Sequence, residues 1–152
     1  AGCDLAVTCD FRVAADTARI GINPVKLGLV YNYRSIYKFG ALFGGAAAKE
    51  IFLTGRFMDA ARAREIGLLH FVVPEAELPQ AAYALAQELA RNAPLAMAGA
   101  KRVINSFVTN HNLSPEDEAE FQGIMDRTWN SEDTQEARRA FAEKRKPQFQ
   151  GR

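Results

Sequence analysis

The sequence predicts a mixed α/β fold in its first half and helices alone in its second half. Up to residue 75, short apolar runs bounded by proline or glycine alternate with helix-like segments. Beyond residue 75, apolar residues recur at i, i+3, i+4 and i+7, as they do over 78–89, and this spacing is typical of helices that bury one face. We therefore expect an α/β core over 1–75 and a helical region over 76–152.

The expected elements of the α/β core follow in this order: a helix over 2–9, strands over 11–14 and 19–22, helices over 32–42, 46–53 and 60–66, and a strand over 68–73. Gly44 and the glycine after it separate the second helix from the third. Asp59 suits the N-cap of the helix over 60–66, and Gly67 suits its end. Pro74 ends the apolar run of the last strand.

The helical region is expected to contain helices over 78–89, 94–106, 115–129 and 131–144. Pro94 suits a first helical position, and Ser114 begins a capping-box-like start. Phe121, Met125 and Trp129 recur at helical spacing and form an apolar stripe. We interpret this stripe as core or subunit packing.

Composition limits the possible partners. The 152 residues suit one domain with a substantial core, and the net charge of +1 gives no field to attract nucleic acid or an acidic membrane. No apolar run approaches the roughly 20 residues of a spanning helix, and no secretory signal opens the chain. Cys3 and Cys9 stand without a CxxC motif or paired histidines, so we expect reduced, buried cysteines and no metal site. We therefore expect a cytoplasmic location.

Two segments carry most of the chemistry. Ala1-Gly-Cys-Asp-Leu5 reads as a helix start with small residues and a carboxylate, and Pro24-Val-Lys-Leu-Gly-Leu-Val-Tyr-Asn-Tyr33 as a tight turn beside it. Together they resemble the crotonase (enoyl-CoA hydratase/isomerase) superfamily, whose signature is Cys-Glu/Asp-Leu after a Gly-rich turn, then Phe-Gly-Leu-Pro-Glu-Val-Lys-Leu-Gly. The resemblance covers 1–152 but only the C-terminal part of a typical member. It implies a fragment: the end of a crotonase-like ββα spiral, then a helical trimerisation region.

The resemblance also implies an acyl-CoA thioester as substrate. Its carbonyl would lie between two backbone N–H groups that stabilise an enolate, one of them at Ala1 with Gly2 beside it. A helix N-terminus offers free donors and partial positive charge, which suits this role. No separate cofactor is implied, since coenzyme A is part of the substrate.

Further site residues are implied in the same way. Pro24, Leu27 and Gly28 would line the substrate site. Phe141 and Lys144 of the last helix would contact the nucleotide end of coenzyme A, often that of a neighbouring subunit. The superfamily assembles as trimers or dimers of trimers, so we expect a homotrimer or hexamer.

Departures from the signature suggest the reaction. Asp4 stands at the first of the two usual glutamate positions, and Pro24, which cannot be an acid or base, stands at the second. Decarboxylation of a malonyl-type thioester needs no base, because loss of CO2 supplies the electron pair of the enolate. The Pro-x-x-Leu-Gly-x-x-Tyr-Asn pattern is similar to that of decarboxylating members, which implies that Tyr31 binds the substrate carboxylate.

Two alternatives stay open. One is hydration or isomerisation of an enoyl-CoA with Asp4 alone, and the other is a non-catalytic acyl-CoA-binding module. RNA binding, known in a crotonase relative, is disfavoured by the near-zero net charge.

Overall fold

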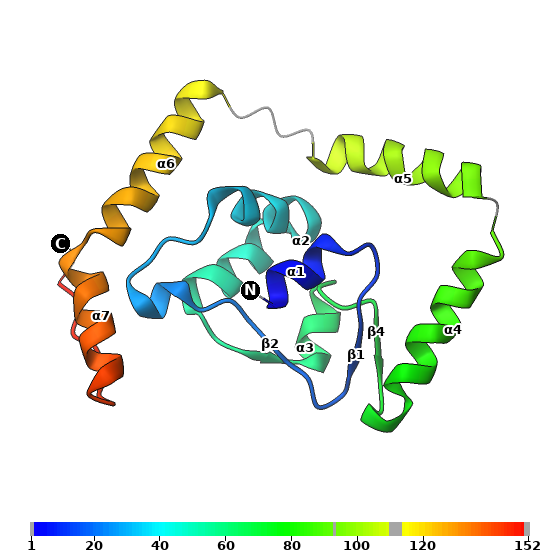
Figure 1. The fold of residues 1–152 in the computed structure, drawn as a ribbon, viewed down its shortest axis with the longest axis horizontal. Coiled ribbons are helices and arrows are strands. Elements are labelled where there is room, and N and C mark those ends of the chain that lie inside the picture. The colour runs from blue at the N-terminus through cyan, green and yellow to red at the C-terminus, as the bar shows by residue number, and fades with distance from the viewer. Residues whose placement is uncertain (1, 93, 110–113, 151–152) are drawn as a thin grey trace.

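A computed structural model describes residues 2–92, 94–109 and 114–150 of the chain (Figure 1). The elements in order are α1 (Gly2–Thr8), β1 (Val13–Ala15), β2 (Arg19–Ile20), the 3₁₀ helix η1 (Pro24–Leu27), α2 (Tyr33–Thr54), β3 (Met58–Asp59), α3 (Ala60–Glu65), β4 (Phe71–Val73), the 3₁₀ helix η2 (Glu75–Glu77), α4 (Leu78–Ala90), α5 (Pro94–Thr109), α6 (Pro115–Trp129) and α7 (Glu132–Ala142). Helices α4 to α7 form an arm that runs around a core built from α1, α2, α3 and the strands (Figure 1).

The strands form two short pairs within the described residues. Strand β1 pairs in parallel with β4, with Val13 opposite Phe71, and β2 pairs antiparallel with β3, with Ile20 opposite Met58. The strand predicted over 68–73 therefore begins later than expected. The reason is that the Leu69 N–H donates to the Ala63 carbonyl at 3.1 Å, so this part of the backbone closes the end of α3 instead of joining a ladder.

The core lies between α2, α3 and the strands. Phe39 and Ile51 of α2 are completely buried, and Leu68 packs in the same cluster. The Phe39 ring meets the rings of Phe43 and Phe52 edge to face, with centroids 5.5 and 5.2 Å apart. Because buried residues of α2 form much of this cluster, the core holds α2 in place, and with it the residues at the start of the helix.

Helix boundaries agree with the capping and glycine signals. The break predicted at Gly44 is present. The backbone of α2 is helical on both sides of this residue, but Gly44 itself has a φ of 81° and a ψ of 159°, which are not helical. Asp59 caps α3 by accepting a hydrogen bond from the Arg62 N–H at 2.8 Å, and Gly67 follows with a φ of 78°. These predictions are confirmed.

The four helices predicted for the arm are confirmed within a few residues. The last ends at Ala142, earlier than expected, because Lys144 has a φ of 54° and reverses the chain.

The packing predicted for Phe121 is also present, since its ring centroid lies 5.7 Å from that of Tyr33 and 6.1 Å from that of Tyr37. No helix in the described ranges is both long and apolar enough to cross a membrane. The division at residue 75 stays a prediction.

The expectation for the cysteines was wrong in part. Both are free, but Cys9 is exposed and Cys3 is only half-buried. The physical reason is that α1 is short and buries Val7 alone, so Cys9, which follows its last residue, lies at the surface.

Candidate active site

Three polar side chains from the start of α2 and the segment before it meet Asp4 of α1. The Tyr31 hydroxyl donates a hydrogen bond to Asp4 Oδ2 at 3.2 Å, and the Ser35 hydroxyl donates to the same oxygen at 2.9 Å. Lys38 Nζ lies 2.9 Å from Asp4 Oδ1 and forms an ion pair with it. We call Asp4, Tyr31, Ser35 and Lys38 the Asp4 cluster.

Local sequence explains how α2 presents these donors. Asn32 caps the helix, because its side-chain oxygen accepts hydrogen bonds from the N–H groups of Arg34 at 2.9 Å and Ser35 at 3.4 Å. Ser35 and Lys38 are three residues apart and therefore lie on one face of the helix. Tyr31 precedes the cap, and its ring stacks on Phe52 at 5.8 Å. The donors are thus held by helix geometry and by the core.

The electrostatics of the Asp4 cluster favour a charged Asp4 and a neutral Tyr31. Burial alone would raise the pKa of Asp4, but the hydrogen bonds and charge supplied by Lys38, Ser35 and Tyr31 outweigh it and hold that pKa below its ordinary value. Burial, then the charge of Asp4, raises the pKa of Tyr31. At neutral pH Tyr31 therefore remains a hydrogen-bond donor, and Asp4 remains a carboxylate.

Lys38 contacts α1 at two residues, Asp4 and Thr8. Asp4 Oδ1 is shielded from solvent, and the Lys38 ammonium lies 2.9 Å from it. Lys38 also donates a hydrogen bond to the Thr8 hydroxyl at 3.0 Å. The lysine side chain is thus fixed at two points, at Thr8 by a hydrogen bond and at Asp4 by charge.

The predicted oxyanion donor cannot be placed, since Ala1 lies outside the described residues. Gly2 is exposed, and a Cβ built on it would meet nothing within 4 Å, so packing within this chain does not require glycine there. Gly2 lies instead on a cavity of about 420 Å³. The other residues that line it are Cys3, Ala6, Val7, Arg12, Arg19, Ile20, Gly21, Asn23, Phe57, Leu68 and Leu69. Asp4 and Tyr31 are not among them.

Of the predicted substrate-binding residues in and after η1, Gly28 has a clear packing role. Gly28 has a φ of 71°, and a Cβ there would lie 3.1 Å from the Asp133 carbonyl carbon and 3.2 Å from the Thr134 nitrogen. Only glycine lets η1 approach the first turn of α7 this closely. Pro24 is half-buried and Leu27 is exposed, so both remain available for the predicted role.

Phe141 lies in α7 and Lys144 follows it. Figure 1 shows α7 apart from α1, and no described contact joins the two residues to the Asp4 cluster. Phe141 is 81% exposed. Lys144 lies at the chain reversal after α7, closed by a hydrogen bond from the Arg145 N–H to the Ala140 carbonyl at 3.0 Å. The predicted contact with coenzyme A is untested by this arrangement.

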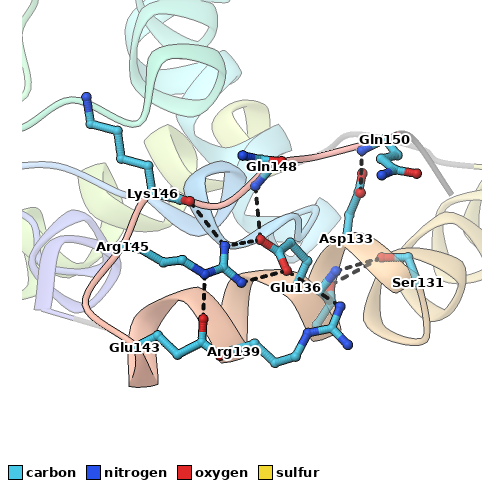
Figure 2. Close-up of polar contacts among 10 residues, drawn as sticks. Ser131, Asp133, Glu136, Arg139, Glu143, Arg145, Lys146, Gln148 and Gln150 are labelled. Atoms are coloured by element: carbon cyan, nitrogen blue, oxygen red, sulfur yellow. Dashed lines mark hydrogen bonds and ion pairs between the residues drawn. The ribbon is translucent and has the colours of Figure 1, made fainter.

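The reversal brings the C-terminal residues back along α7 (Figure 2). Glu136 forms ion pairs with Arg145 and with Arg139, and Glu136 Oε1 accepts a hydrogen bond from the Gln148 N–H at 3.1 Å. Asp133 accepts another from the Gln150 N–H at 2.7 Å. We call these residues the C-terminal clasp.

Sequence reasoning missed Ser35 and Lys38 as partners of Asp4. The signal was present in principle, since a serine and a lysine follow the Asn32 cap at the spacing of one helix face. The contact between α1 and α2 could not be predicted from the sequence. Within the described residues, no group of three His, Cys, Asp or Glu side chains could hold a metal ion.

Comparison with known proteins adds independent findings. A family model described as Enoyl-CoA hydratase/isomerase matches residues 1–152. The chain is 32% identical over 148 residues to a methylmalonyl-CoA decarboxylase of Escherichia coli (strain K12), which covers 97% of this chain and 57% of that protein. It is 36% identical over 152 residues to the enoyl-CoA isomerase/hydratase fer4 of Mycosarcoma maydis, with 99% of this chain and 55% of that protein covered.

A solved structure is similar as well. Methylmalonyl-CoA decarboxylase complexed with 2S-carboxypropyl CoA superimposes with a TM-score of 0.91 at 32% identity, over 99% of this chain and 57% of that chain. The present chain therefore spans little more than half the length of the relatives that it matches.

Proposed function

Since the chain belongs to the enoyl-CoA hydratase/isomerase family, we propose that the whole protein is an enzyme that decarboxylates a malonyl-type CoA thioester through a stabilised enolate. The observation that carries this proposal is the state of Asp4. Its carboxylate is engaged by Tyr31, Ser35 and Lys38, and those contacts lower its pKa. A carboxylate held in this way is a poor proton acceptor.

Decarboxylation requires no proton acceptor in its first step. The bond between the α-carbon and the substrate carboxylate breaks, CO2 leaves, and the electron pair of that bond passes into the thioester as an enolate. A proton from solvent then adds to the α-carbon. The enzyme has to stabilise the enolate oxygen, and one preorganised backbone donor contributes about 10²–10³ in rate. Ala1, with Gly2 beside it, is the proposed donor from this chain.

Tyr31 is the proposed partner of the substrate carboxylate. Its raised pKa keeps the hydroxyl protonated, and a neutral donor orients a carboxylate without solvating it as strongly as a cation would. Support also comes from the relatives, since one is named a methylmalonyl-CoA decarboxylase and a solved structure of that enzyme holds a carboxylated CoA analogue. Pro24, Leu27 and Gly28 would border the acyl group, and Phe141 and Lys144 the nucleotide, in a trimer or hexamer.

Hydration or isomerisation of an enoyl-CoA is the second candidate. It is favoured by the similarity to fer4, which is named an isomerase/hydratase and is 36% identical. In this reaction Asp4 would have to exchange protons, so its ion pair with Lys38 would have to open. The third candidate function is a module that binds acyl-CoA without catalysing a reaction.

Product analysis separates these candidates. The protein made from its complete reading frame is incubated with methylmalonyl-CoA and, separately, with crotonyl-CoA, and the CoA esters are resolved by chromatography. We expect propionyl-CoA from the first and at most slow formation of a 3-hydroxyacyl-CoA from the second. Efficient hydration of crotonyl-CoA with methylmalonyl-CoA unchanged would contradict the proposal.

A further inference from the structure

We propose that Lys38 is a positioning residue that sets substrate specificity, because its charge cancels that of Asp4 and lets the site accept a thioester with a carboxylate of its own. This inference rests on the proposed function and extends it to a residue of α2 that does not itself touch the reacting atoms. It concerns the class of acyl group: carboxylated as opposed to neutral.

The geometry gives Lys38 this role. The ammonium group lies 2.9 Å from Asp4 Oδ1, and both side chains are mostly shielded, with exposed fractions of 29% for Lys38 and 26% for Asp4. The hydrogen bond to Thr8 Oγ1 at 3.0 Å holds the ammonium in place from the side of α1. Because the two opposite charges lie only 2.9 Å apart, their fields largely offset each other at a distance.

The position of Tyr31 shows why neutrality matters. Its hydroxyl has one proton, which it donates to Asp4 Oδ2, so it would have to turn from Asp4 to donate to a substrate carboxylate. That substrate carboxylate would lie within a few ångströms of the Asp4 carboxylate. Like charges at that separation repel strongly in a partly buried site. Lys38 offsets this repulsion without placing a cation directly on the substrate carboxylate, since its ammonium lies at the other oxygen of Asp4.

The test compares two non-reactive ligands that differ only in a carboxylate: 2S-carboxypropyl CoA and propyl CoA. Their dissociation constants are measured by calorimetry for the full-length wild type and for Lys38→Met. We expect the variant to bind 2S-carboxypropyl CoA about tenfold more weakly, while its affinity for propyl CoA changes less than twofold. The matched control is Lys49→Met, which removes a lysine from the same helix outside the Asp4 cluster and should change neither constant.

Rescue distinguishes charge cancellation from a structural role. The double variant Lys38→Met with Asp4→Asn has no charge on either residue, so it should regain the wild-type preference between the two ligands. Lys38→Arg should keep that preference. An equal loss of affinity for both ligands, an unchanged ratio in Lys38→Met, or no rescue in the double variant would each overturn the inference.

The same experiment keeps this inference apart from the proposed function. Turnover of methylmalonyl-CoA by the wild type tests the reaction, whereas the ratio of the two dissociation constants tests only the charge balance at Asp4. If the wild type decarboxylates and the ratio is insensitive to Lys38, the inference alone is wrong. If the wild type does not bind 2S-carboxypropyl CoA, no carboxylate is accepted beside Asp4 and the inference fails as well.

Discussion

The hydroxyl of Tyr31 donates a hydrogen bond to Asp4 Oδ2 over 3.2 Å, so the tyrosine expected to bind a substrate carboxylate binds a carboxylate of the protein itself. The contact joins the segment before α2 to the first turn of α1. It presents a donor and an anion side by side, and Ser35 and Lys38 stabilise the anion. The proposed reaction depends on how the hydrogen bonds and the positive charge of these neighbours stabilise the Asp4 carboxylate.

Replacement of Tyr31 by phenylalanine should reduce decarboxylation much more than stability. The ring and its stacking on Phe52 remain, and Asp4 keeps its contacts with Ser35 and Lys38, so we expect a loss of about 1 kcal/mol or less in the free energy of unfolding. Loss of the proposed substrate contact should lower kcat/KM for methylmalonyl-CoA by about ten- to a hundredfold. Steady-state kinetics and urea denaturation measure the two effects.

Tyr33→Phe is the matched control for that variant. Its ring packs against Phe121, and its hydroxyl contacts only Arg34 in the described structure, so activity should stay within twofold of the wild type. If both variants lose activity equally, Tyr31 has no special role.

The C-terminal clasp should be sensitive to acid. Hydrogen bonds from Arg145 and from the Gln148 N–H lower the pKa of Glu136 from 4.5 to about 2. A lowered pKa means that Glu136 contributes its stabilisation fully above about pH 4.5 and loses it as the pH falls toward 2. Glu136→Gln should therefore lower the thermal unfolding temperature at pH 7, and the difference from the wild type should shrink as the pH approaches 2.

Glu88→Gln serves as the control for Glu136→Gln, because Glu88 lies on an exposed position of α4. It should leave the unfolding temperature at pH 7 unchanged. A difference for Glu136→Gln that is constant between pH 7 and pH 3 would show that the ionised carboxylate is not what stabilises the clasp.

Gly28→Ala should destabilise the contact between η1 and α7. The residue has a φ of 71°, and the added Cβ would lie 3.1 Å from the Asp133 backbone. Left-handed strain and overpacking together predict a loss of about 2–4 kcal/mol in the free energy of unfolding, measured by urea denaturation. Gly40→Ala is the opposite case, because its Cβ would meet nothing within 4 Å in a helix, and it should stabilise by about 0.5–1 kcal/mol.

Lys144→Gly tests whether this residue acts through its backbone or its side chain. Lys144 has a φ of 54°, a conformation that glycine adopts without strain, so the variant should be about 1 kcal/mol more stable than the wild type. Lys144→Ala keeps the strain and gives no such gain. If the ammonium contacts coenzyme A as predicted, both variants should have a higher KM for the acyl-CoA substrate than the wild type. KM values equal to that of the wild type would show that Lys144 is not part of the site.

The predicted fold class, the C-terminal part of a crotonase-like spiral, is confirmed by a structural match with a TM-score of 0.91 over 99% of the chain. Helix boundaries followed from local signals such as Asp59 and Gly44, because capping and positive φ depend on neighbouring residues. The pairing of Val13 with Phe71 could not be predicted in the same way, since strand pairing depends on distant parts of the chain.

The candidate site was predictable only in part, for the same reason. Asp4 and Tyr31 were named from their motifs, and the structure joins them. Lys38 was not assigned a role, because its importance arises from a contact with a residue of another helix. Gly28 was expected to line the substrate site, whereas its close packing on α7 already accounts for the glycine.

The most direct test of the account is the rate at which full-length Asp4→Asn converts methylmalonyl-CoA to propionyl-CoA, measured beside the wild type. A carboxylate that serves no proton transfer can lose its charge, so we predict that both proteins form propionyl-CoA and that their kcat values agree within about tenfold. Absence of propionyl-CoA from the wild type, or a loss of more than a hundredfold in the variant, would contradict decarboxylation without a base at Asp4.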